Sequence, residues 1–281
     1  MTTAAARLRE AMAAERPLQI VGAINAYAAK LAERAGFRAL YLSGAGVANH
    51  SLGLPDLGVI HLGDVITDAS RIAAATELPL LVDIDTGWGH AFTIDRAVRE
   101  LERAGVAAVQ IEDQAGAKRC GHRPGKEVVD PGEMVDRIQA ALAARVELLI
   151  VARTDAATVD ETVDRSRTYA AAGADVIFAE ALQSLDDYRR VTQAVEVPVL
   201  ANITEFGVTP LFTRDELRDA GVAIVLYPLS AARAAARASE RVYETIRREG
   251  TQAPLLGDMQ TRDELYDALD YLRFERALDE L

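Results

Sequence analysis

The stretch Ala104-Gly105-Val106-Ala107-Ala108-Val109-Gln110-Ile111-Glu112 contains the pattern that decides the fold. It follows residues 94–103, whose apolar spacing predicts an amphipathic helix. Glycine suits the left-handed position just after a helix ends. The same dipeptide, followed each time by an apolar run, recurs at Ala35-Gly36, Ala172-Gly173 and Ala220-Gly221. Each repeat therefore predicts a helix, a turn and a short buried parallel strand.

Eight strands are expected in all. Four follow the repeated dipeptide, two open with proline and two complete the set: 18–24, 39–42, 79–82, 108–111, 147–152, 176–178, 198–200 and 224–226. Eight alternating strands and helices in about 230 residues predict a (β/α)8 barrel of the TIM type. A doubly wound open sheet is the alternative, but no Gly-x-Gly-x-x-Gly motif opens a helix after the first strand.

The length of 281 residues suits one barrel with additions. We expect a single barrel domain over 1–281, with a helical segment at about 1–16. C-terminal helices are expected over about 229–281, the first of them at 231–248. These helices exceed what a barrel needs, so they are expected either to cap the barrel or to pack on a neighbouring subunit.

The composition excludes several classes of protein. Lys and Arg number 31 against 43 Asp and Glu, a net charge of −12, which argues against nucleic-acid and anionic-membrane partners. No apolar run approaches the roughly 18 residues of a transmembrane helix, and Met1 to Arg16 lacks the apolar core of a signal peptide. The single cysteine excludes an intrachain disulfide, and the histidines are scattered. We therefore expect a soluble cytoplasmic protein in which any metal is held by carboxylates.

Polar side chains follow the predicted strands where a barrel of this kind places its catalytic groups. They are Asn25, Ser43, Asp83, Asp85, Glu112, Asp113, Arg153, Asp155, Glu180, Asn202 and Thr204. The pair Asp83 and Asp85 stands before glycines and can present oxygen ligands to Mg²⁺, which takes one or two carboxylates plus waters and substrate oxygens. Glu112, on the next strand, is expected to bind the metal or to hold its waters.

The loop Lys118-Arg119-Cys120-Gly121-His122-Arg123 is the second marked feature. Its cations favour a reactive thiol at Cys120 and attract a polyanionic substrate. The flanking glycines, Gly116 and Gly125, would let the loop fold over the site. Arg153, at a strand end, suits a bidentate clamp on a carboxylate. The alternative is a mobile surface loop with an incidental cysteine.

With these residues the chain closely resembles the 2-methylisocitrate lyases of the isocitrate lyase and phosphoenolpyruvate mutase superfamily. The resemblance runs from about residue 21 to the C-terminus, and the Lys-Arg-Cys-Gly-His loop is highly specific within the superfamily. The matching motifs are Tyr41-Leu42-Ser43-Gly44, Ser51-Leu52-Gly53-Leu54-Pro55-Asp56, Ile111-Glu112-Asp113-Gln114, Lys118-Arg119-Cys120-Gly121-His122-Arg123-Pro124, Ala152-Arg153-Thr154-Asp155, Asn202-Ile203-Thr204-Glu205-Phe206-Gly207 and Met259-Gln260-Thr261-Arg262.

The resemblance implies Mg²⁺-dependent cleavage of 2-methylisocitrate to pyruvate and succinate, in the methylcitrate route of propionate breakdown. It implies metal binding by Asp83 and Asp85. Cys120, Tyr41, Glu112 and His122 are the expected catalytic residues: Cys120 is the expected acid, and the base is Tyr41, by analogy with the family, or Glu112, by its position. The substrate-binding residues would be Ser43, Gly44, Ala45, Asp56, Cys120, Gly121, Arg153, Glu180, Asn202, Ile203, Thr204, Arg233 and Arg262.

The resemblance also implies a homotetramer of barrels in which the last barrel helix is exchanged between neighbours. The chain departs from the family pattern at Ala45, where glycine is common, and at Thr86 and Trp88, where Ile and Phe are expected. Two further alternatives are a related enzyme acting on isocitrate, dimethylmalate or oxaloacetate, and a non-catalytic barrel that serves as a binding subunit.

Overall fold

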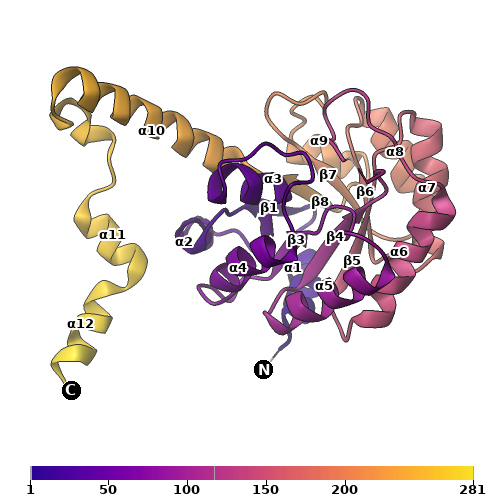
Figure 1. Cartoon of the computed structure of the whole chain (residues 1–281), viewed down its shortest axis with the longest axis horizontal. Helices are drawn as coiled ribbons and strands as arrows, with labels where there is room; N and C mark the ends of the chain where they lie inside the picture. The colour runs from indigo at the N-terminus through magenta and orange to yellow at the C-terminus, as the bar shows by residue number, and fades with distance from the viewer. Residues whose placement is uncertain (1, 117, 281) are drawn as a thin grey trace.

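The computed structural model describes residues 2–116 and 118–280, and its centre is a closed barrel of eight parallel strands (Figure 1). The strands follow one another around the barrel in chain order, and β8 pairs with β1 to close it. Their bounds are β1 Leu18–Gly22, β2 Leu40–Leu42, β3 Leu80–Asp83, β4 Ala108–Glu112, β5 Leu149–Thr154, β6 Val176–Ala179, β7 Val199–Asn202 and β8 Ile224–Tyr227. The predicted α/β barrel is thereby confirmed, and the open sheet is excluded.

Several strands extend further toward their carboxyl ends than the apolar runs suggest. β5 was expected over 147–152 but continues to Thr154, because Arg153 and Thr154 still pair with Phe178 and Ala179 of β6. Apolar composition marks the part of a strand that is packed on both faces. It misses the polar residues that continue the ladder into the site.

Helices on the outside of the barrel connect its strands (Figure 1). They are α2 Ala26–Arg34, α3 Gly44–Gly46 with the π-helical turn η1 Val47–Ser51, α4 Leu62–Ala73, α5 Ala91–Arg103, α6 Pro131–Ala144, α7 Val159–Ala171, α8 Leu185–Ala194 and α9 Arg214–Asp219. The repeated Ala-Gly dipeptide ends four of them as expected. Gly105 has φ +89°, a conformation open to glycine at little cost.

The core consists of two apolar layers. One lies between the strands and the outer helices and includes Val82, Val109 and Tyr169. The other fills the barrel interior and includes Leu81 and Leu200. The N-terminal helix α1, Ala4–Ala14, adds Leu8 to the inner layer. The amino-terminal end of the barrel is thus closed by apolar side chains.

The C-terminal segment leaves the barrel as an arm, which consists of α10 Ser230–Glu249, the 3₁₀ helix η2 Ala253–Asp258, α11 Arg262–Leu269 and α12 Tyr271–Asp279. Figure 1 shows α10 projecting outward, with α11 and α12 turning back past α2. The Tyr27 hydroxyl donates to Gln260 Oε1 at 2.6 Å, and Arg34 pairs with Asp267. Large apolar side chains remain exposed on the arm, among them Tyr243, Leu256, Leu272, Phe274 and Leu278. Among the described residues, no helix is long and apolar enough to cross a membrane.

Candidate active site

A cavity of about 440 Å³ lies at the carboxyl ends of the strands, where the sequence places the polar residues. It collects side chains from strands far apart in the sequence and from the loop that follows β4. Thirteen of the predicted site residues line it: Tyr41, Ser43, Ala45, Asp56, Asp83, Cys120, Gly121, His122, Arg153, Glu180, Asn202, Thr204 and Arg233. Six of the eleven residues predicted from the strand ends are among them: Ser43, Asp83, Arg153, Glu180, Asn202 and Thr204.

Of the residues to which the resemblance gives a role in catalysis, substrate binding or metal binding, five do not line this cavity. Gly44 supplies a backbone N–H to Asp83 behind it, while Asp85, Glu112 and Ile203 are buried. Arg262 begins α11 on the projecting arm. The arm carries Arg262 away from the substrate cavity of this chain.

Two aspartates lie at the carboxyl end of β3, Asp83 as its last residue and Asp85 two residues later. The N–H groups of Gly44 and Asp85 each donate to an oxygen of Asp83 at 3.0 Å. Asp85 itself has φ +50°, in the left-handed region that Asp tolerates better than most residues. Lys118 Nζ lies 2.6 Å from Asp85 Oδ1 and 2.7 Å from Asp56 Oδ1. The sequence places Lys118 in the basic loop but gives no sign of this pairing.

This acidic group is suited to a divalent cation. Burial, and then the charge of Asp83, raise the pKa of Asp85 to about 6. Asp85 Oδ2 and both oxygens of Glu112 are buried without a hydrogen-bond partner among the described residues. In the part of the chain that the structure describes, no group of three or more His, Cys, Asp or Glu side chains is arranged to hold a metal ion by itself. Two carboxylates with room for waters and substrate oxygens is the ligand set typical of Mg²⁺.

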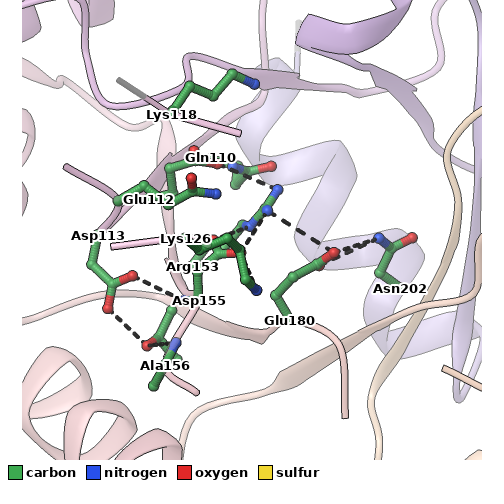
Figure 2. Close-up of polar contacts among 12 residues, drawn as sticks. Gln110, Glu112, Asp113, Lys118, Lys126, Arg153, Asp155, Ala156, Glu180 and Asn202 are labelled. Carbon is green, nitrogen blue, oxygen red and sulfur yellow. Dashed lines mark hydrogen bonds and ion pairs between the residues drawn. The ribbon is translucent and has the colours of Figure 1, made fainter. Parts of the chain in front are cut away.

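Arg153 lies at the centre of the charged groups (Figure 2). Its Nε and Nη2 donate to the two oxygens of Asp155 at 2.8 and 3.0 Å. Its Nη1 lies 3.3 Å from Glu112 Oε2, and Nη2 lies 3.9 Å from Glu180 Oε1. The guanidinium carbon is 5.2 Å from the centre of the Phe178 ring. Part of the negative charge that balances Arg153 thus comes from the protein's own carboxylates. Asp155 fixes the orientation of the guanidinium group where it faces the cavity.

The loop after β4 reaches across the cavity to the loop after β7. The Val208 N–H donates to His122 Nδ1 at 3.2 Å, so the ring proton lies on Nε2, which is 3.0 Å from Glu180 Oε1. Burial would raise the pKa of Glu180, but Arg153 and His122 outweigh it and hold this pKa below its usual value. Glu180 is therefore ionised beside the cavity. Cys120, half-buried and free, lies on the same loop two residues earlier.

The two candidate bases differ in their surroundings. The Tyr41 hydroxyl donates to Gln110 Oε1 at 2.8 Å, and burial together with Asp83 raises its pKa well above the usual value. Tyr41 is thus a neutral phenol. Burial also raises the pKa of Glu112, against the opposing charge of Arg153. Tyr41 lines the cavity, whereas Glu112 is fully buried outside the cavity lining, with its Oε2 3.3 Å from Arg153 Nη1.

The strand-end pattern places Asn25 in the ring of site residues, but its side chain accepts a hydrogen bond from the Ala28 N–H and caps α2. The same pattern leaves Lys126 out of the site. Lys126 Nζ contacts Asp155 Oδ1 at 3.0 Å. No sequence motif predicts the contact between Lys126 and Asp155, because it depends on how the loop after β4 returns to the barrel.

A closed barrel of eight parallel strands, with charged side chains collected in a cavity at the carboxyl ends of the strands, is the architecture of a TIM-barrel enzyme. The phosphoenolpyruvate phosphomutase family model matches residues 8–247, and the chain belongs to that family. The structure of an oxaloacetate acetylhydrolase superposes with a TM-score of 0.92 at 31% identity, covering 99% of this chain and 97% of the other. That of a 2,3-dimethylmalate lyase gives 0.90 at 35%, covering 99% and 95%.

Curated relatives narrow the assignment. The 2-methylisocitrate lyase of Salmonella typhimurium is 57% identical over 97% of this chain and 95% of its own length. That of Shewanella oneidensis is 55% identical over 99% and 97%. Within the superfamily, the chain belongs to the 2-methylisocitrate lyases, which are carbon–carbon lyases.

Proposed function

We propose that this chain cleaves 2-methylisocitrate to pyruvate and succinate in the presence of Mg²⁺. The observation that carries the proposal is one cavity lined by Asp83, Arg153 and the Cys120 loop, with Asp85 buried next to Asp83. A substrate with three carboxylates needs both a cation site and fixed guanidinium groups. Family membership supports the same chemistry.

Asp83 and Asp85 are the residues proposed to hold Mg²⁺, directly or through waters, with Glu112 behind them. A phosphonopyruvate hydrolase with a TM-score of 0.85 and 29% identity, covering 99% of this chain and 98% of its own, has been solved with oxalate and Mg²⁺. When bound, the ion supplies Lewis-acid stabilisation of the negative charge that develops on the hydroxy-carboxylate half of the substrate. Ser43 and the N–H groups near Ala45 orient the part that becomes pyruvate.

The proton transfers are assigned to the chain's own side chains. The substrate hydroxyl loses its proton to a base, the carbon–carbon bond breaks, and a carbanion forms next to a carboxylate. The base is Tyr41, which lines the cavity, or Glu112, which is buried beside Arg153. Cys120 donates the proton that converts the carbanion to succinate, while Arg153 and Arg233 hold the carboxylates.

We propose from the exposed apolar side chains of the arm that the protein forms an oligomer. A homotetramer in which α10 packs on a neighbouring barrel would cover the apolar side chains that the arm exposes. Arg262 could contribute to substrate binding only in an arrangement where the arm reaches a cavity, such as exchange between subunits. Light scattering of the purified protein should give four copies, and removal of residues 250–281 should lower that number.

The function is tested with purified protein, 2-methylisocitrate and Mg²⁺, by measuring the release of pyruvate and succinate. The products should appear in equal amounts, and EDTA should abolish both. Release that is unaffected by EDTA would remove the metal from the proposal. Parallel kcat/KM values for isocitrate, 2,3-dimethylmalate and oxaloacetate decide the substrate. If kcat/KM for one of these acids is higher than for 2-methylisocitrate, that acid is the preferred substrate.

A further inference from the structure

A buried polar cluster lies behind the substrate cavity, and no step proposed above uses it. Its centre is Asp113, which directly follows Glu112 at the end of β4 and has no exposed surface. The other members are Arg165 and Tyr169, one turn apart on α7 and both buried. None of the three lines the cavity.

The Asp113 carboxylate accepts hydrogen bonds from three sides. The Tyr169 hydroxyl donates to Oδ2 at 2.8 Å, and the Thr154 hydroxyl donates to the same oxygen at 2.7 Å. The backbone N–H of Asp155 donates to Oδ1 at 2.9 Å. Figure 2 draws the contacts between Asp113 and the end of β5. A fully buried carboxylate with this many donors is fixed in one orientation.

The cluster acts on the part of β5 that carries the carboxylate clamp. Asp155, whose N–H is bound by Asp113, holds both Nε and Nη2 of Arg153. The Asp113 N–H in turn donates to the Arg153 carbonyl at 3.1 Å. The backbone on either side of Thr154 is thus tied to Asp113, and Asp155 transmits that position to the guanidinium that faces the cavity.

The base of the Cys120 loop is tied to the same cluster. The Val129 N–H donates to the Asp113 carbonyl at 2.8 Å, and Arg165 Nη1 donates to the Val129 carbonyl at 2.9 Å. Arg165 Nη1 also contacts the Tyr169 hydroxyl at 2.9 Å and Asp113 Oδ2 at 3.3 Å. One cluster therefore fixes both the strand end that carries Arg153 and the point where the loop returns to the barrel.

We infer that Asp113, Arg165 and Tyr169 are positioning residues that set the Arg153 guanidinium against the carboxylate of the substrate. The inference rests on the proposed function only in taking Arg153 as a carboxylate anchor. A displacement of a positioning group by a fraction of an ångström to one ångström changes rates without unfolding the protein. The cluster is therefore expected to act on turnover and carboxylate affinity.

Two buried tyrosines provide a matched test. Tyr169 of α7 belongs to the cluster, whereas the hydroxyl of the equally buried Tyr188 of α8 has no hydrogen-bond partner among the described residues. Tyr169→Phe should lower kcat/KM for 2-methylisocitrate by about 10- to 100-fold, by analogy with the cost of misplaced positioning groups. It should also weaken the binding of succinate, measured by calorimetry, while Tyr188→Phe leaves both unchanged.

A second pair separates positioning from stability. Thr154→Val removes the hydroxyl that Asp113 accepts, and Thr154→Ser keeps it. The serine variant should retain more succinate affinity than the valine variant at equal thermal stability. The inference is wrong, and the cluster is structural only, if Tyr169→Phe and Tyr188→Phe have the same kcat/KM and succinate affinity. It is also wrong if Thr154→Val and Thr154→Ser bind succinate equally well.

The two proposals fail in different ways. If the wild-type protein binds succinate but does not cleave 2-methylisocitrate, the proposed substrate is wrong. The calorimetric comparison of the variants would still decide the role of the cluster. A wild-type protein that binds no succinate would show that Arg153 is not a carboxylate anchor. The positioning inference would then be wrong as well.

Discussion

The two ends of the barrel use the same eight strands in opposite ways. At the amino-terminal end α1 places Leu8 against Leu18 and Ile224, and the interior is closed by apolar contact. At the carboxyl end the strands carry the ionisable side chains of Asp83, Glu112 and Arg153, all of them buried. Stability and chemistry are thus separated along one axis, because strands such as β3 and β4 are apolar where they start and end in a carboxyl group.

The largest effect on activity is expected at the carboxyl end. Cys120→Ser should lower kcat by about 100- to 10,000-fold, the usual contribution of a positioned general acid, with KM little changed. Steady-state kinetics and a melting curve measure this. A near-normal rate would remove Cys120 from the mechanism, and a large fall in Tm would assign it to the fold.

Gly121→Ala is expected to have the next largest effect. A Cβ at Gly121 would lie 2.4 Å from Arg153 Nη2 and 2.5 Å from Glu180 Oε1, so the loop would have to move away from the clamp. We expect kcat/KM to fall by about 10- to 100-fold, as for other misplaced catalytic groups. Gly116→Ala is the control, since no described atom lies within 4 Å of its Cβ. Equal losses in both variants would refute the close approach as the cause.

The affinity for Mg²⁺ should depend on pH in the absence of substrate. Burial and Asp83 raise the pKa of Asp85 to about 6, so its carboxylate is protonated at a higher pH than an ordinary aspartate. Metal affinity should therefore be full above this pKa and be lost as the pH falls through it, by about tenfold per pH unit at most for one proton. Calorimetric titration at several pH values measures it. A constant affinity from pH 5 to 8, roughly a unit or two either side of this pKa, would contradict the assignment.

The smallest effect on activity is expected at the amino-terminal end. Leu8→Ala should lower the free energy of unfolding by about 2–5 kcal/mol, the usual range for such a truncation in a core. Its kcat should stay close to that of the wild type at a temperature where both are folded. Denaturant unfolding and kinetics measure the two quantities. A lowered kcat would show that the two ends are not independent.

The sequence predicts the barrel well because its repeat unit is local. The helix, the glycine at Gly105 and the following strand lie within about twenty residues, and hydrophobic spacing reports on all three. The strand-end rule then locates Asp83 and Arg153 without any knowledge of their neighbours. The same rule places Asn25 in the site, although its side chain serves only as a helix cap.

What could not be predicted depends on contacts between distant segments. Lys118 pairs with Asp56 and Asp85 only because two loops meet over the cavity. Asp113 and Tyr169 lie 56 positions apart in the sequence, and nothing in either segment indicates their hydrogen bond. Single-sequence reasoning identifies residues by type and spacing, so it cannot supply partners of this kind.

The helix α10 joins the cavity to the rest of the arm without interruption. It begins where Ser230 and Arg233 contact Glu205 beside the site, and its twenty residues span about 30 Å. The position of Arg233 is therefore coupled to whatever holds the far end of the helix. In a screen of variants for lost lyase activity, substitutions in the arm would therefore appear alongside those in the cavity, and distance from the site would be a poor guide to which substitutions are tolerated.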